Sequence, residues 1–220
     1  MSLHAALLHN KEEFARVVSF TPGIDRLLHL DFTENNGELT EQLVADTQLF
    51  SNYITRTLEV ADAKYGIGGY DEHRTFYNRS ALFGTDDKLT PSPVRRLHLG
   101  IDIWGEANTP VMAPLDGIVH SFAFNDAYGD YGTTIILKHT IGGTTFHTLY
   151  GHLGLSAIKY LKEGDLIKKG ESFASFGIET ENGHWPSHLH FQLIEDLKGW
   201  KGDYPGVCAY AEKETGVSFQ

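Results

Sequence analysis

Two short histidine motifs, far apart in the sequence, place the strongest constraint on the fold of this chain. The first contains His98 and Asp102, and the second contains His188 and His190. Glycine and isoleucine around the first motif favour a strand or an extended loop over a helix. On a strand, residues two or four positions apart point to the same face, so each motif can direct its two polar side chains to one point. The four side chains are therefore candidates for a divided metal site.

The residue types of the two motifs suit zinc. A catalytic zinc ion typically takes three ligands from His, Asp, Glu or Cys and leaves a fourth position for water. Cys208 is the only cysteine, which excludes an intrachain disulfide and a cluster of thiolate ligands. Each motif alone has a simpler interpretation: a His-x-His pair is more often solvated or packed, and His98 with Asp102 could form a hydrogen-bonded turn pair. The order of the motifs along the chain decides between these interpretations.

In their order, the motifs resemble those of peptidase family M23, the LytM and lysostaphin group of peptidoglycan endopeptidases. The matching segments are His98-Leu99-Gly100-Ile101-Asp102, Ala113-Pro114-Leu115-Asp116-Gly117, Tyr150-Gly151-His152-Leu153 and His188-Leu189-His190-Phe191. Residues 163–171 resemble a later hairpin of the family, which biotinyl and lipoyl carrier domains share. The resemblance covers residues 95–195 and implies a bacterial metalloprotease with Zn²⁺ as its cofactor.

The resemblance also implies a role for each polar residue. His98, Asp102 and His190 would be the zinc ligands, and His188 and His152 would be catalytic residues near the water. Zinc-dependent amide hydrolysis needs a polarised carbonyl, a water of lowered pKa and a route for a proton to the leaving amine. One further histidine within reach of the water could accept that proton, and another could hold or donate to the developing oxyanion.

Two other segments supply candidate substrate contacts. Residues 181–187 depart from the Gly/Ser/Thr-rich loop of the family and are bulkier and more polar, which makes His184 a candidate. This loop and residues 202–207 resemble M23-type domains fused to class III aminotransferases and small-molecule kinases. Upstream, residues 71–77 combine charge with aromatic rings. Arg74 would suit a substrate carboxylate through a bidentate contact, with Tyr77 beside it, unless the segment is a solvated connection.

The patterns predict an α+β protein that is mainly β. Residues 1–84 predict a helical segment packed on the core, with one helix over residues 10–20 and another from an N-cap at Thr40 to Ala63. Glycines at 66–69 would end the second helix. Residues 85–200 contain short β-rich runs separated by Gly, Asp and Asn, which predict an antiparallel β domain. The resemblance implies that this is an M23-like zinc metallopeptidase domain of hybrid or barrel-sandwich type. Residues 201–220 would form a C-terminal tail.

Composition narrows the partners. The formal net charge of -11 argues against nucleic acid and against an anionic membrane surface as partners. The sequence near the N-terminus contains no sustained apolar run, so neither a signal peptide nor a membrane span is predicted. The sequence as written therefore predicts a cytoplasmic protein, and a periplasmic or secreted one if a leader has been removed.

The leading functional hypothesis is a zinc-dependent metalloendopeptidase that hydrolyses a peptide bond in peptidoglycan cross-links or muropeptides. Its partner would be a peptide or peptidoglycan fragment. One alternative is an intracellular M23-like metallohydrolase linked to amine or phosphoamine metabolism. Another is a non-catalytic cell-wall-binding or activator relative, which the intact set of ligand residues disfavours. A carrier domain is discounted because Lys168 and Lys169 lack the sequence context of a modified lysine.

Overall fold

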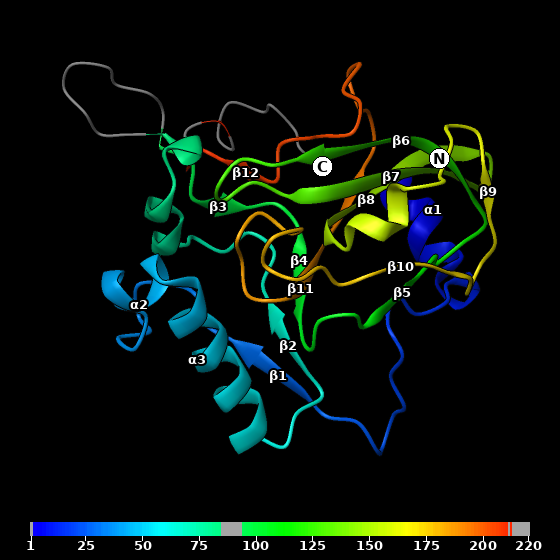
Figure 1. The fold of residues 1–220 in the computed structure, drawn as a ribbon. Helices are drawn as coiled ribbons and strands as arrows, with labels where there is room; N and C mark the ends of the chain where they lie inside the picture. Colours follow the sequence, from blue (N-terminus) through cyan, green and yellow to red (C-terminus); the bar gives the residue numbers. More distant parts are fainter. Residues whose placement is uncertain (1, 85–93, 211, 213–220) are drawn as a thin grey trace.

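The computed structural model describes residues 2–84, 94–210 and 212 (Figure 1). An eight-stranded sheet runs through the molecule in the order β1-β2-β4-β11-β8-β7-β6-β9. Its strands are β1 (Leu27–Leu30), β2 (Tyr65–Gly68), β4 (Ile101–Trp104), β6 (Gly117–Asn125), β7 (Gly132–Ile141), β8 (Thr144–Leu153), β9 (Leu166–Ile167) and β11 (His188–Ile194). Among the described residues, every neighbouring pair in this sheet is antiparallel except β1 with β2. The expected fold class, mainly β with an antiparallel sheet, is confirmed.

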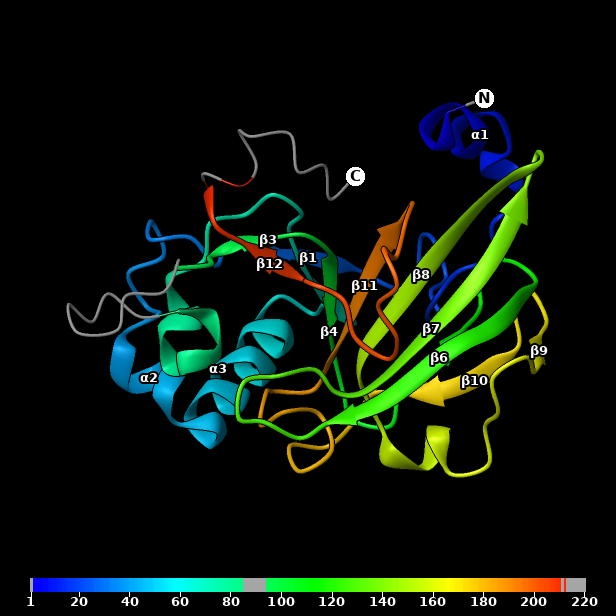
Figure 2. The same cartoon turned by 90° about the horizontal axis from the view of Figure 1, so that it is seen from above.

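Two small antiparallel sheets flank the large one. The first pairs β5 (Pro110–Met112) with β10 (Ser172–Ser175), and the second pairs β3 (Leu97–His98) with β12 (Val207–Cys208). The β3–β12 pair brings part of the expected C-terminal tail into the fold beside the first motif. Figure 2 shows the long strands β6, β7 and β8 as a twisted fan, with α1 at one end of it and α2 and α3 at the other. Right-handed twist of this kind is the ordinary consequence of strand geometry.

The helix expected over residues 40–63 is two helices. Thr40 is the expected N-cap, and its side chain accepts a hydrogen bond from the Leu43 amide at the start of α2 (Glu41–Ala45). Asp46 then takes an extended conformation and caps α3 (Thr47–Val60) by accepting from the Leu49 amide. A short side chain that bonds the backbone in this way favours a new helix start over continuation of the old one. The helix therefore divides at Asp46.

The prediction of a helix over residues 10–20 is wrong, because the helix of this region lies further upstream. The helix is α1 (Leu3–His9), with Ser2 as its N-cap, and a 3₁₀ turn at Lys11–Glu13 follows it. Val17 and Val18 pack instead against the main core, and the Val17 carbonyl accepts a hydrogen bond from Met112 of β5. β-branched side chains fit this extended, half-buried backbone better than a helix.

The N-terminal segment also contributes two strands that the sequence did not predict. β1 and β2 extend the large sheet beyond β4, and Gly68 of β2 pairs with Asp102 of β4. The glycines expected to end a helix instead permit close packing. A Cβ on Gly66 would lie 2.4 Å from Leu30 Cδ1. The expectation of a purely helical segment is therefore wrong for residues 27–30 and 65–68.

Helix α3 covers the end of the sheet formed by β1, β2 and β4. Its predicted apolar stripe is confirmed, because Phe50, Ile54 and Leu58 are buried. These side chains share one cluster with Phe32 and Trp104. Burying an apolar side chain of this size contributes about 1.5–3 kcal/mol. The cluster therefore fixes β4, the strand that carries Asp102. In the described part of the chain, every helix falls short of the length and hydrophobicity that a bilayer crossing requires.

Candidate active site

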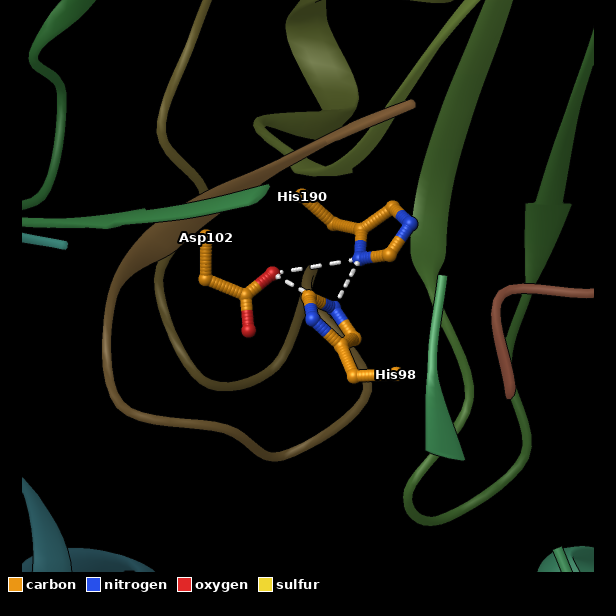
Figure 3. A group of neighbouring side chains, drawn as sticks. All are labelled: His98, Asp102 and His190. Atoms are coloured by element: carbon orange, nitrogen blue, oxygen red, sulfur yellow. Dashed lines mark hydrogen bonds and ion pairs between the residues drawn. The ribbon is translucent and has the colours of Figure 1, made fainter. Parts of the chain in front are cut away.

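Three polar side chains converge where β3, β4 and β11 meet (Figure 3). Asp102 and His190 are direct partners in the antiparallel pair of β4 and β11, which places both side chains on one face. His98 reaches the same point from β3, across the turn at Gly100. A Cβ on Gly100 would lie 2.5 Å from His190 Cε1. The turn thus needs glycine for the His190 ring to fit.

The donor atoms of these residues face one another at short range. His98 Nε2 lies 2.9 Å from His190 Nδ1 and 3.2 Å from Asp102 Oδ1, and His190 Nδ1 lies 3.1 Å from Asp102 Oδ1. All three residues are buried. Zinc bonds of about 2.0–2.1 Å in a tetrahedron separate adjacent ligand atoms by about 3.3 Å. The residues expected as ligands therefore form a cluster of nearly the size that a zinc ion requires.

Hydrogen bonds behind the cluster define which atoms carry lone pairs. His98 Nδ1 lies 2.8 Å from the Gly69 carbonyl, which can only accept, so this nitrogen carries the proton. The Gln192 amide donates its Nε2 to the Pro205 carbonyl at 3.2 Å, which leaves Gln192 Oε1 to accept from His190 Nε2 at 3.1 Å. When each ring carries its single proton on that nitrogen, its other nitrogen directs a lone pair at the Asp102 carboxylate. Three acceptors at this range repel one another unless a cation lies among them.

His152 and His188 lie beside this cluster with their rings 4.1 Å apart. Each donates from Nδ1 to a backbone carbonyl: His152 to Asn182 at 2.8 Å and His188 to Pro186 at 2.7 Å. Their Nε2 atoms therefore carry the lone pairs. His152 has a φ of 62°, a left-handed conformation that is uncommon outside glycine and is typical of constrained functional residues.

Burial keeps these imidazoles neutral. It lowers the pKa of His98 and of His188 to about 4, with the positive charge of Arg74 adding to the effect at His98. Burial and the neighbouring His188 also hold the pKa of His152 well below its usual value. Burial opposes ionisation of Asp102, but His98 and Arg74 outweigh it and keep the pKa of this carboxyl well below its usual range. At neutral pH the site therefore contains a carboxylate and neutral imidazoles, the forms that bind metals and accept protons.

A cleft of about 270 Å³ opens over these residues. The segment with Tyr77, Leu82 and Phe83 lines one part of it, and Trp200 and Tyr204 line another. Asp102, His152, His188 and His190 also line it. A concave, mostly aromatic surface with a few convergent polar groups is the usual form of a ligand site.

The three candidate substrate contacts, Arg74, Tyr77 and His184, lie in different surroundings. Tyr77 lines the cleft, but the Arg74 side chain is 1% exposed and forms ion pairs with Asp102 and Glu72. Arg74 also lines the cleft, and its guanidinium is bound to carboxylates of this chain. The ring of His184 lies 5.6 Å from that of Tyr128, and His184 is outside the described lining of the cleft. Contact of Arg74, Tyr77 and His184 with a substrate stays a prediction.

Sequence reasoning missed two residues of the site. Trp104 stacks on His188, and the Tyr131 hydroxyl lies 3.4 Å from His190 Nε2. The alternation of a strand could have indicated Trp104, because it lies two positions after Asp102 and shares its face. Tyr131 follows a turn between two strands, where no periodic pattern directs a side chain.

Comparison with known proteins agrees with this arrangement. Residues 96–202 match the family model described as peptidase family M23. An uncharacterized metalloprotease of Haemophilus influenzae is 37% identical over 46% of this chain and 21% of the relative. A lipoprotein NlpD/LppB homolog of Pseudomonas aeruginosa is 34% identical over 44% of this chain and 29% of the relative. The chain thus spans less than a third of the length of either relative.

Two solved structures are similar to about half of this chain. A zinc-containing peptidase from Vibrio cholerae is 26% identical, with a TM-score of 0.36 over 50% of this chain and 30% of that chain. The catalytic domain of lysostaphin from Staphylococcus simulans is 20% identical, with a TM-score of 0.38 over 55% of this chain and 81% of that chain. The family match and the motifs define a metallopeptidase domain. Residues 96–202, just under half of the chain, are the part that matches peptidase family M23.

Proposed function

We propose that this protein is a zinc-dependent metalloendopeptidase that hydrolyses a peptide bond in peptidoglycan cross-links or muropeptides. The convergence of lone pairs from His98, Asp102 and His190 supports the metal, because three buried acceptors at 2.9–3.2 Å need a cation among them. When bound, zinc would polarise the scissile carbonyl and lower the pKa of the attacking water. The match of residues 96–202 to peptidase family M23 supports a peptide as the substrate.

The residues of this chain would carry the proton steps. His188 and His152 present neutral Nε2 atoms at the cleft, each fixed by a hydrogen bond from its own Nδ1. One of them would accept the proton of the attacking water, and the protonated ring would pass it to the leaving amine. The other also presents a lone pair at Nε2, so it would orient the attacking water by accepting a second hydrogen bond from it. The aromatic walls would exclude bulk water from these steps, which strengthens each electrostatic interaction.

Incubation of the zinc-loaded protein with purified muropeptides, followed by mass spectrometry of the products, tests this proposal. We expect new fragments that gain one water at an amide bond, and none with protein treated with a chelator or with the His188→Ala variant. A zinc-loaded wild-type protein that leaves cross-linked and uncross-linked muropeptides intact would contradict it. We further propose the cell envelope as the place of action if cross-linked material is cleaved, and the cytoplasm if only soluble fragments are.

A further inference from the structure

The loop that connects β2 to β3 contacts two of the three proposed metal ligands, although it lies outside the segment that matches the family. The Gly69 carbonyl accepts a hydrogen bond from His98 Nδ1 at 2.8 Å. Arg74 Nη1 donates to Asp102 Oδ2 at 2.5 Å, which leaves Oδ1 as the oxygen that faces the two histidines. The family match begins only at residue 96.

We propose that Arg74 is a positioning residue for the metal centre, which holds Asp102 as a ligand through one oxygen only. This inference rests on the proposed metal binding. A carboxylate with both oxygens free can rotate or bind an ion through both, which would occupy the position left for water. The guanidinium prevents this by engaging Oδ2. Hydrogen-bond partners behind a metal ligand typically fix its orientation in this way.

The surroundings of Arg74 are built for a guanidinium. Its Nε donates to Glu72 Oε2 at 2.7 Å, and the Phe32 amide donates to Glu72 Oε1 at 3.0 Å, so the second carboxylate is itself fixed. The guanidinium carbon lies 5.1 Å from the centre of the Phe32 ring and 5.6 Å from that of Phe76. A planar group with several fixed donors can join two carboxylates and pack between rings, whereas a lysine ammonium cannot reproduce this geometry.

The backbone around Arg74 also leaves room for the guanidinium. A Cβ on Gly68, the β2 residue opposite Asp102, would lie 2.6 Å from Arg74 Nη2. Glycine at this position therefore gives the guanidinium its place against the sheet. The loop is also bonded to β3, because the Asp71 amide donates to the His98 carbonyl at 2.8 Å and the His98 amide donates to the Glu72 carbonyl at 3.0 Å. The N-terminal segment and the M23 domain thus share one metal centre.

Three variants test the role of Arg74. Arg74→Lys keeps the charge and loses the planar fork. Glu72→Gln with Arg74→Met removes both charges together, so that the extra carboxylate is not left buried without its partner. Arg79→Met is the matched control, since Arg79 bonds Tyr128, Thr47 and the His184 carbonyl and does not line the cleft. Folding of each metal-free protein is checked by circular dichroism and thermal melting.

The deciding measurements are zinc affinity, by competition with a chromogenic chelator, and the visible spectrum of the Co²⁺ form. We expect zinc affinity to fall about 10- to 100-fold in the double variant and less in Arg74→Lys, with altered Co²⁺ bands in both and wild-type values in Arg79→Met. A purely structural role would lower the melting temperature of the metal-free protein and leave the affinity and spectrum of the folded fraction unchanged.

Each outcome bears on the proposal. Wild-type zinc affinity and wild-type Co²⁺ bands in the folded double variant would overturn it. If the double variant does not fold, Arg74→Lys decides, and wild-type behaviour there would overturn the requirement for a guanidinium. A wild-type protein that binds no zinc, or binds zinc and cleaves no muropeptide, would instead refute the proposed function.

Discussion

The indole of Trp104 lies flat against the imidazole of His188, with ring centroids 3.9 Å apart and an angle of 11° between the planes. The two residues are direct partners across β4 and β11, which places their side chains on the same face. The ring of His152 also contacts His188, with centroids 4.1 Å apart, and all three residues line the cleft. Contacts with both rings restrict rotation of His188, so that its Nε2 atom keeps one direction.

We expect Trp104→Phe to lower turnover while zinc content is maintained. The smaller ring would leave His188 free to rotate, and misplacement of a reacting group by about 1 Å can cost about 100-fold in rate. Steady-state kinetics and elemental analysis on the same preparations measure the two effects. Phe50→Leu is the control, because Phe50 packs against Trp104 in the same cluster without contacting His188. Equal loss of turnover in both variants would refute a specific role for the stacking.

Replacement of the histidines by alanine should divide them into two groups. His190→Ala removes one of three proposed ligands and should sharply reduce zinc content. His188→Ala and His152→Ala should retain zinc and lose about 10²–10⁴ in rate, the usual effect of removing a group that transfers or orients the reacting proton. Zinc content and rate are measured on the same samples. Loss of zinc in His188→Ala would make His188 a ligand, and full occupancy in His190→Ala would show that His190 is not one.

Gly100→Ala should impair metal binding although Gly100 is not a ligand. The new methyl would lie 2.5 Å from His190 Cε1 and 2.9 Å from the Phe191 carbonyl oxygen, so the His190 ring must move. Gly37→Ala is the control, since nothing lies within 4 Å of a Cβ there. Zinc titration followed by chelator competition compares the two. Equal zinc affinity in both variants would contradict a close fit between the turn and the ring.

Stability should fall on acidification partly through His147, which is not among the residues that line the cleft. Burial lowers the pKa of His147 to about 4, and the nearby His120 and Lys138 add to the shift. The unfolded chain then takes up a proton at higher pH than the folded one. The contribution of His147 is thus intact above about pH 6.5 and is lost as the pH falls towards 4.

Urea unfolding of the metal-free protein at about pH 7.5 and about pH 5 measures this dependence. His147→Gln should reduce the difference in unfolding free energy between the two conditions. An unchanged difference in His147→Gln would contradict the lowered pKa.

The sequence was sufficient for the parts of the site that obey strand periodicity. Asp102 and His190 were expected on strands, and antiparallel pairing places them opposite each other. The convergence of His98 with them was also expected. These predictions succeeded because alternation along a strand fixes the face to which a side chain points, whatever the distant contacts are.

Arg74 and the strands of the N-terminal segment could not be predicted in this way. A charged residue in a polar loop ordinarily lies in solvent, and only the distant Asp102 and Glu72 carboxylates make burial of the guanidinium favourable. Similarly, the glycines at 66 and 68 weaken a local preference for strand. They are explained only by the side chains of Leu30 and Arg74 that pack against them. Contacts of this kind are set by tertiary structure and leave no local pattern.

The Gly69 carbonyl has a consequence for how this metallopeptidase domain can be moved between proteins. One oxygen accepts from His98 at 2.8 Å and lies 3.4 Å from Arg74 Nη2, so a peptide group upstream of the family segment is bonded to the metal site. A chimera that transplanted residues 96–202 into another host would carry all three proposed ligands and leave these partners behind. We therefore expect a graft of this domain to need the chain from β1 onward. Gene fusions that preserve activity should keep their junctions upstream of residue 27.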